Sequence, residues 1–173
     1  MNNILFKFFF SWSSFPAIAW SSLFVSNFLI YLFIIIALAF PLIKHRDFFY
    51  SILVGGTGFM AFIVSYIIKN IFMVPRPFIT DHIIPLVVES GYSFPSSHVT
   101  VISALSVVIW KINHKLGYLF FVFTIFVAFS RMIIGVHYPI DVIAGMFFGI
   151  IIGLLALWFY KITKQFAFLK KKL

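Results

Sequence analysis

Long apolar stretches separated by short polar segments dominate the chain. An α-helix needs about 20 mostly apolar residues to cross a bilayer. Five stretches meet or approach that length, at residues 23–43, 48–68, 99–110, 116–130 and 140–160. The third is short, and it gains length if Ser96, Ser97 and His98 begin the same helix. The pattern predicts an all-α, polytopic transmembrane bundle of five spans that forms a single domain over residues 1–173.

The first 20 residues form a separate segment. They contain a Phe-rich run that is interrupted by Lys7, by several serines and by Pro16. Amphipathic segments of this kind lie in the membrane interface, so residues 1–20 are predicted to form an interfacial or re-entrant helix, with a sixth span as the alternative. A cleaved signal peptide is disfavoured, because the apolar segment is long and the charged leader is small.

The composition excludes several classes of protein. Hydrophobic residues make up 63% of the chain and charged residues 10%, and the mean hydropathy is +1.13. Soluble domains are about 45–50% apolar and about 25% charged, and a chain of this size has too little interior to hide the excess. Disorder requires low hydrophobicity. The absence of cysteine excludes a disulfide framework, a thiolate zinc site and a cysteine nucleophile.

The net charge of +9 is divided between the two ends of the predicted spans. One side carries Lys44, Arg46, Lys111, Lys115, Lys161, Lys164, Lys170, Lys171 and Lys172. The other carries Lys7, Lys69, Arg76 and Arg131. The positive-inside rule places the first group in the cytoplasm, with residues 161–173 as a basic tail that binds anionic lipid heads and not nucleic acid. The loop at residues 70–95 then faces outward, into the periplasm of a bacterial inner membrane.

Polar residues at the outward ends of the spans come from three segments. The first is Lys69 with Arg76-Pro77, the second is Tyr92-Ser93-Phe94-Pro95-Ser96-Ser97-His98, and the third is Ser130-Arg131 with His137 and Asp141. Each has a structural alternative: cations that snorkel to the interface, a serine that caps a helix, and an Asp–His pair that ties a loop to a helix. Ionisable residues at membrane depth are costly and commonly functional.

The three segments together match the requirements of phosphoryl transfer. The cations neutralise phosphate oxygens, and the helix start after Pro95 offers free N–H groups to an anion. His137 and Asp141 are four residues apart, so a helix places both on one face, and a carboxylate beside an imidazole suits a histidine nucleophile. Carboxylate clusters that hold magnesium are missing from this set, which predicts a metal-independent reaction without a cofactor.

These residues resemble the signature of the type 2 phosphatidic acid phosphatase superfamily. The family pattern is Lys, six residues, Arg-Pro; then Pro-Ser-Gly-His; then Ser-Arg, five residues, His, three residues, Asp. The chain matches it in order and spacing between Lys69 and Asp141, with Ser97 in place of the usual glycine. The resemblance implies the helical core shared with vanadium-dependent haloperoxidases, and inhibition by vanadate.

The resemblance also implies a role for each site residue. His137 would attack phosphorus and form a phosphohistidine, Asp141 would orient His137, and His98 would protonate the leaving oxygen. The phosphate oxygens would be held by Lys69, Arg76, Ser96, Arg131 and the Ser97 amide. Outward-facing members of this size act on undecaprenyl diphosphate, lipid A 1-phosphate or phosphatidylglycerol phosphate, and we favour the first two substrates.

Several alternatives remain at this stage. A phospholipid-headgroup transporter or flippase would need the cations but not the His137–Asp141 pair, and a structural subunit or a haloperoxidase are further candidates. The expected partners are the lipid phosphate substrate and membrane lipids, with no nucleic acid and no obligate protein partner. In the loop, residues 83–88 are either an apolar wall or simple packing. Asp81, His82 and Glu89 either tune the substrate or are solvated, and the latter is favoured.

Overall fold

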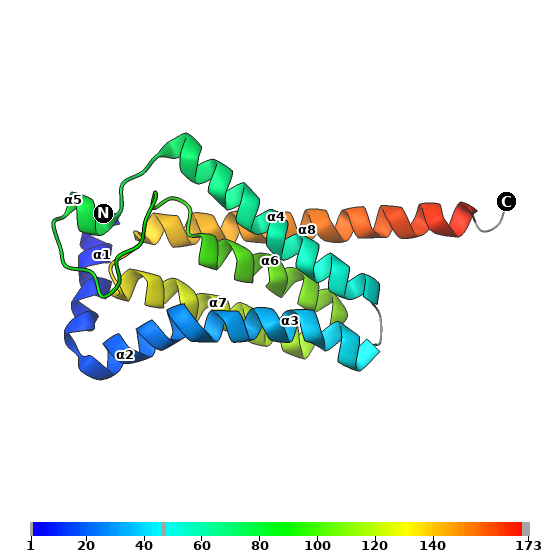
Figure 1. The fold of residues 1–173 in the computed structure, drawn as a ribbon, viewed down its shortest axis with the longest axis horizontal. Helices are drawn as coiled ribbons and strands as arrows, with labels where there is room; N and C mark the ends of the chain where they lie inside the picture. The colour runs from blue at the N-terminus through cyan, green and yellow to red at the C-terminus, as the bar shows by residue number, and fades with distance from the viewer. Residues whose placement is uncertain (1, 46–47, 171–173) are drawn as a thin grey trace.

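The computed structural model describes residues 2–45 and 48–170, and in this part of the chain it contains helices and no strand. Figure 1 shows the helices as a bundle with α8 running along its whole length and past the ends of the others. The elements in chain order are α1 (Asn2–Ser11), a 3-10 turn η1 (Trp12–Ser14), α2 (Pro16–Phe24), a π-helical turn η2 (Val25–Leu29), α3 (Ile30–His45), α4 (Phe48–Phe72), α5 (Pro77–Thr80), α6 (Ser97–Ile112), α7 (His114–Ile133) and α8 (Pro139–Lys170).

The expected transmembrane bundle is present. Within the described residues, four helical segments are long and apolar enough to cross a membrane, at Pro16–Lys44, Phe48–Thr80, His114–Ile133 and Pro139–Gln165. The remaining predicted span is α6, which begins at Ser97 and has 16 residues. At a rise of about 1.5 Å per residue it is about 24 Å long, which is less than the hydrocarbon thickness of about 30 Å.

Helix α6 can be shorter than the bilayer is thick because other helices enclose it. It packs against α4, α7 and α8, and Val99, Ile102 and Val108 on it are fully buried. A helix surrounded by protein does not have to match the bilayer thickness with its own side chains. At its N-terminus Pro95 and Ser96 are buried, while Ser97 and His98 are half-buried.

Glycines on α8 allow α6 to come this close. A Cβ atom built at Gly145 would lie 2.9 Å from the Ser96 carbonyl oxygen, and one built at Gly153 would lie 2.7 Å from the Val107 Cβ. At Gly149 the Cβ would lie 2.5 Å from the Ser103 Cβ. The four-residue spacing of small residues puts all three on one face, as in other close membrane-helix contacts.

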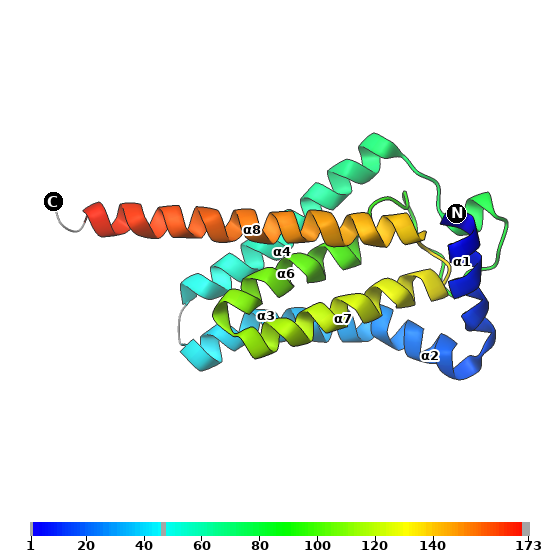
Figure 2. The same ribbon diagram turned by 180° about the vertical axis from the view of Figure 1, so that it is seen from behind.

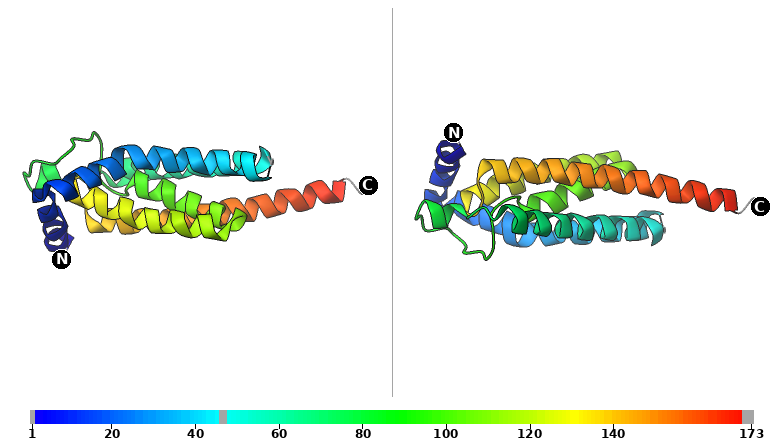
Figure 3. Two further views of the ribbon diagram at one scale, coloured as in Figure 1. Left: turned by 90° about the horizontal axis from the view of Figure 1, so that it is seen from below. Right: turned by 90° about the horizontal axis from the view of Figure 1, so that it is seen from above.

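The N-terminal segment differs from the expectation of one helix over residues 1–20. Helix α1 ends at Ser11 and α2 begins at Pro16. Proline suits the first turn of a helix, because the backbone N–H groups there have no partner within the helix and proline lacks this group. From Pro16 the chain continues into the first spanning segment. Helix α1, with ten residues, is too short for a sixth span, and it lies across the end of the bundle (Figure 3).

Charged side chains lie at both ends of the bundle, as the sequence indicated. Lys69, Arg76 and Arg131 are at the end that carries α1 and α5 (Figures 1 and 2), while Lys44, Lys111 and Lys115 belong to the opposite end. Arg46, Lys171 and Lys172, which were assigned to the same group as Lys44, lie outside the described residues. The side chain of Lys170 is likewise not described.

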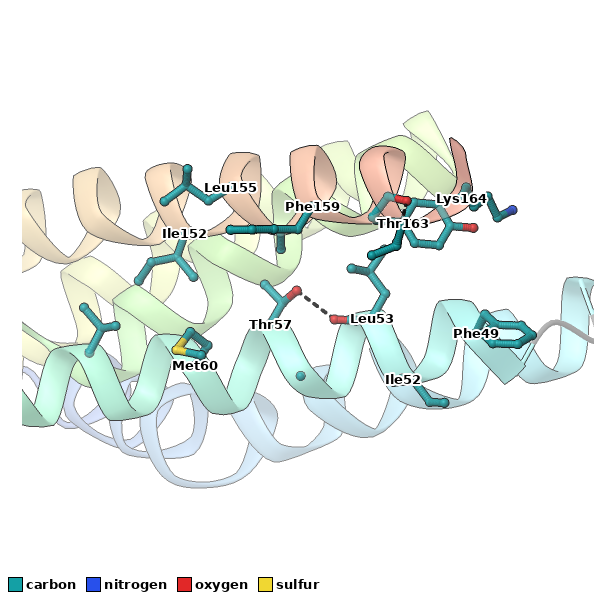
Figure 4. A pocket seen from close by; sticks show the side chains of 14 residues that line it. Phe49, Ile52, Leu53, Thr57, Met60, Ile152, Leu155, Phe159, Thr163 and Lys164 are labelled. Atoms are coloured by element: carbon teal, nitrogen blue, oxygen red, sulfur yellow. Dashed lines mark hydrogen bonds between the residues drawn. The ribbon is translucent and has the colours of Figure 1, made fainter. Parts of the chain in front are cut away.

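An apolar groove of about 930 Å³ opens between α4 and α8. Figure 4 shows Ile152 and Phe159 pointing from α8 toward the face of α4 that carries Thr57 and Met60. The groove extends along α4 as far as Val64. The next residue, Ser65, donates a hydrogen bond from Oγ to the Ser97 Oγ at 2.9 Å. The groove itself ends at Val64 and Ile152, which pack beside Ala104 of α6, about two helical turns after Ser97.

Candidate active site

The three polar segments of the sequence meet at one end of the bundle. Their positions follow from the helix boundaries, because each residue lies at or near the end of a helix. Lys69 is in the last turn of α4, Arg76 precedes α5, Ser96, Ser97 and His98 begin α6, Arg131 is in the last turn of α7, and His137 and Asp141 flank the start of α8 at Pro139.

His137 and Asp141 form a buried pair. The His137 Nδ1 lies 3.5 Å from the Asp141 Oδ2, and the two side chains are 1% and 0% exposed. The Tyr138 backbone N–H donates to the same Oδ2 at 2.7 Å. Asp141 also anchors α6, because its carbonyl oxygen accepts a hydrogen bond of 3.0 Å from the Ser96 N–H. The Tyr138 N–H thus holds the Asp141 carboxylate beside the His137 Nδ1. The other ring nitrogen, Nε2, does not face this carboxylate and can react with a substrate.

Ser93 is a third member of this cluster, and the sequence reasoning assigned it no role. Its hydroxyl donates a short hydrogen bond to the Asp141 Oδ2 and lies 3.4 Å from the His137 Nδ1. Its backbone is fixed on both sides, since its N–H donates to the Val74 carbonyl at 2.8 Å and its carbonyl accepts from the Lys69 Nζ at 3.0 Å. Ser93 therefore bridges the gap between the carboxylate and the imidazole.

Burial keeps His137 neutral. Removal from water lowers the pKa of His137 well below its ordinary value of 6.5, and the nearby Arg131, Lys69 and Arg76 charges act in the same direction. A neutral imidazole has a lone pair on one ring nitrogen, and only this form is a nucleophile. With Nδ1 facing Asp141 and Ser93, the lone pair is expected on Nε2.

Lys69 and Arg76 bind carbonyl oxygens of the loop that precedes α6. The Lys69 Nζ donates to the Tyr92 carbonyl at 2.8 Å as well as to that of Ser93. The Arg76 Nε donates to Gly91 at 3.0 Å and its Nη2 to Ser90 at 3.1 Å. Both cations therefore fix the path of the loop.

Glu89 bridges the two arginines of the site. Its Oε2 lies 3.0 Å from the Arg76 Nη1, and its Oε1 lies 2.5 Å from the Arg131 Nη2. Burial alone would raise the pKa of Glu89, but Arg131 and then Arg76 outweigh it and hold that pKa below its ordinary value. The interpretation of Glu89 as a solvated loop residue is wrong, because its carboxylate turns inward onto these guanidiniums.

Arg131 also reaches the first spanning segment. Its Nη1 donates to the Ser26 Oγ at 2.7 Å, and Ser26 is fully buried in the π-helical turn η2. Such turns are rare and often occur at functional sites. The sequence reasoning found only hydrophobicity in this region, although a serine in an apolar span is itself a signal of an interior polar contact.

The start of α6 differs from a capped helix. Ser96 occupies the N-cap position, but its hydroxyl makes no capping hydrogen bond, and its buried Oγ has no hydrogen-bond partner in the described part of the chain. The buried Arg131 Nε is in the same situation. The Ser97 hydroxyl, which replaces the family's glycine, accepts from Ser65 and so is turned toward α4. Two buried donors of the site thus make no hydrogen bond to the part of the chain that the structure describes.

The other loop residues lie outside this cluster. The Asp81 Oδ2 accepts a hydrogen bond of 3.3 Å from the Tyr138 hydroxyl, and His82 is exposed with a positive φ of 51°. Ile84 and Val88 are 90% and 76% exposed, whereas the alternate residues Ile83 and Val87 are half-buried. The apolar stretch 83–88 therefore both packs and presents apolar side chains outward.

The described residues, 2–45 and 48–170, include no group of three or more His, Cys, Asp or Glu side chains that could hold a metal ion. The model of the PAP2 superfamily matches residues 47–164, a range that contains all three motifs. The chain belongs to the PAP2 superfamily. It is accordingly an integral-membrane phosphatase, a hydrolase of phosphoric esters.

Known PAP2 proteins resemble this chain over most of its length. The undecaprenyl-diphosphatase BcrC of Bacillus subtilis is 31% identical over 145 residues, which are 83% of this chain and 75% of that protein. The fold is shared with LpxE of Aquifex aeolicus, at a TM-score of 0.67 and 22% identity over 90% of this chain and 94% of that one. It is also shared with a PAP2-type phosphatidylglycerolphosphate phosphatase of Bacillus subtilis, at a TM-score of 0.63 and 19% identity over 91% of this chain and 93% of that one.

Proposed function

We propose that this PAP2 protein hydrolyses the terminal phosphate of a membrane lipid with a phosphate or diphosphate headgroup, with undecaprenyl diphosphate as the first candidate, through a phosphohistidine on His137. The observation that supports the chemistry best is the buried His137–Asp141 pair beside two arginines. The identity to an undecaprenyl-diphosphatase supports the substrate. Lipid A 1-phosphate is the second candidate and phosphatidylglycerol phosphate the third.

The reaction has two steps. In the first, the Nε2 lone pair of His137 attacks the terminal phosphorus, the bond from phosphorus to the bridging oxygen breaks, and His98 donates a proton to that leaving oxygen. In the second, a water molecule gives a proton to His98 while its oxygen attacks the phosphohistidine. Inorganic phosphate leaves, and His137 and His98 return to their starting states. The reaction consumes one water and needs no oxidant or metal.

The remaining site residues act on charge and orientation. Asp141, with Ser93, holds the His137 ring and stabilises the positive charge that develops on it. Arg131, Arg76, Lys69, the Ser96 hydroxyl and the Ser97 amide bind the phosphate oxygens. Donors that are fixed before the substrate binds need no reorganisation during the reaction, and such preorganised charge is a large contribution to catalysis.

Two features support a lipid substrate at the outer face. The groove between α4 and α8 is lined mainly by apolar side chains and runs from Val64 and Ile152 toward Phe49 and Lys164, away from the site, so it suits the apolar chain of a lipid whose headgroup reaches the site. The basic side chains of Lys44, Lys111 and Lys115 lie at the opposite end of the bundle, and the positive-inside rule places such residues in the cytoplasm. We therefore infer a site that faces the periplasm of the inner membrane.

The test measures phosphate release by the full chain in detergent, with undecaprenyl diphosphate as substrate and a chelator present. We expect full activity, a trappable phosphoenzyme, and the loss of both in His137→Ala. The matched control is His114→Gln, at the opposite end of the bundle, where the ring centroid lies 5.2 Å from that of Trp110. Activity that survives His137→Ala would refute the nucleophile. A wild-type chain that binds the headgroup without releasing phosphate would instead support a transporter.

A further inference from the structure

One carboxylate occupies the place between the two arginines of the site. The two oxygens of Glu89 contact different guanidiniums, at 3.0 Å from Arg76 and 2.5 Å from Arg131. The arginine side chains are 5% and 0% exposed, and that of Glu89 is 23% exposed. A phosphate presents two oxygens with similar spacing, and guanidiniums bind carboxylate and phosphate in the same fork geometry. Glu89 therefore makes the contacts that the substrate phosphate is expected to make.

The carboxylate fills this place incompletely. The Ser96 Oγ and the Arg131 Nε are buried and have no hydrogen-bond partner within residues 2–45 and 48–170. Buried donors are nearly always satisfied, so each exception needs an explanation. A carboxylate has two oxygens and both are already engaged, whereas a phosphate group brings at least one more. The two unused donors are explained if the site is built for an anion with more oxygens than Glu89 has.

The segment that carries Glu89 can release it. Residues 81–89 form no helix or strand, and they precede the stretch 90–93, whose carbonyl oxygens Lys69 and Arg76 hold. Leu86 ties this stretch to the neighbouring loop through its N–H, which donates to the Ile134 carbonyl at 3.0 Å. Gly91, two residues after Glu89, is exposed and has a φ of 75°, a conformation in which glycine is favoured. Segments with few buried contacts open at a small fraction of the global free energy of unfolding.

We propose that Glu89 is an internal anion, which holds the phosphate position between Arg76 and Arg131 in the empty enzyme and leaves when a phosphate group binds. The inference rests on the proposed function, because it takes these arginines as the phosphate site. Its consequence is selective. Inorganic phosphate, the product, must compete with Glu89 and binds weakly, while a lipid diphosphate has an apolar chain and additional oxygens with which to displace it.

The size of the effect follows from population arithmetic. A site that is free in about a tenth of the molecules binds its ligand about tenfold more weakly than a site that is always free. Glu89→Gln keeps the shape of the side chain and removes its charge. We expect the dissociation constants of orthovanadate and inorganic phosphate, measured by titration calorimetry on the full chain in detergent, to fall at least about tenfold.

A charge-matched control lies in the same loop. Asp81→Asn removes one negative charge near the site but none from the arginines, since the Asp81 carboxylate accepts from the Tyr138 hydroxyl. We expect this variant to bind both anions as the wild type does. An equal gain in affinity for Asp81→Asn would reduce the effect to general electrostatics. Unchanged or weaker anion binding by folded Glu89→Gln would overturn the proposal.

A second measurement keeps Glu89 in place, in case the substitution prevents folding. The chain has no cysteine, and Val88, next to Glu89, is 76% exposed. Val88→Cys therefore offers a single attachment point for a fluorophore. Saturating vanadate should change its emission, and no change would overturn the proposal. Binding does not require turnover. If the anion affinity rises in Glu89→Gln but the wild-type chain hydrolyses no lipid phosphate, the proposed function is refuted and this inference stands.

Discussion

The contact between α6 and α8 offers a direct test of how packing positions the site. A Cβ at Gly149 would lie 2.5 Å from the Ser103 Cβ and 3.1 Å from the Ala104 backbone nitrogen. Ordinary contacts between carbon atoms are about 3.5–4.0 Å. The atoms that Gly149→Ala would meet belong to the backbone or its first side-chain carbon, so no side-chain rotation relieves the clash. The helices must separate by about 1 Å.

Gly149→Ala is expected to lower the rate of the reaction more than it lowers the stability of the fold. Overpacking of this kind costs about 1–3 kcal/mol of stability, and alanine recovers up to about 1 kcal/mol through its better helix propensity. Helix α6 carries His98 and α8 carries Asp141, so the same shift moves the reacting groups apart. A misplacement of about 1 Å costs about a hundredfold in rate. We therefore expect a loss of about ten- to hundredfold in kcat with a modest change in stability.

The assay pairs phosphate release with thermal unfolding of the purified chain in detergent. Gly55→Ala on α4 is the matched control, because its Cβ would meet the flexible end of Leu38 at 3.4 Å. We expect that variant to keep both its activity and its stability. Gly149→Ala with unchanged kcat and melting temperature would refute the argument that α6 and α8 are in backbone contact. Equal losses in both variants would show that the effect is not specific to this contact.

Two further outcomes follow from the structure. Ser93→Ala should lower kcat by about tenfold or more with little change in KM, since a hydrogen bond to a charged group contributes about 1.5–3 kcal/mol. Ser93→Thr should recover part of the lost kcat, and Ser97→Gly should keep a kcat near that of the wild type. A change in KM alone for Ser93→Ala would refute a positioning role for Ser93. In membrane vesicles, a single cysteine at Thr80 should react with an impermeant reagent from outside while one at Lys111 should not, and the reverse labelling would overturn the periplasmic assignment.

Periodicity and length were sufficient to predict the bundle. Apolar stretches of spanning length have few alternatives in a chain with so little charge. The boundaries near the N-terminus were wrong because Pro16 begins a helix here, whereas a proline within an apolar run more often interrupts one. Whether a short helix such as α6 is enclosed depends on tertiary packing, which the sequence pattern does not contain.

The motif predicted the residues that meet at the site, but not all of their neighbours. Ser26, Glu89 and Ser93 come from a span and a loop outside the motif, and nothing in their local sequence shows which side chain they contact. Ser26 reaches Arg131 across 105 positions of sequence. Contacts of that range are properties of the folded chain, so a serine in an apolar span predicts a polar partner without predicting which one.

The first motif has a structural task as well as an electrostatic one. Lys69 and Arg76 donate to carbonyl oxygens of residues 90–93, and that stretch begins beside Glu89 and ends at Ser93. If neutralising phosphate were their only task, these cations would have no need of fixed carbonyl partners. Their spacing therefore also reflects the length of loop that must be held so that Ser93 reaches Asp141. Arg131 differs, because its buried Nε has no hydrogen-bond partner among the described residues, and we therefore expect it to bind a phosphate oxygen directly.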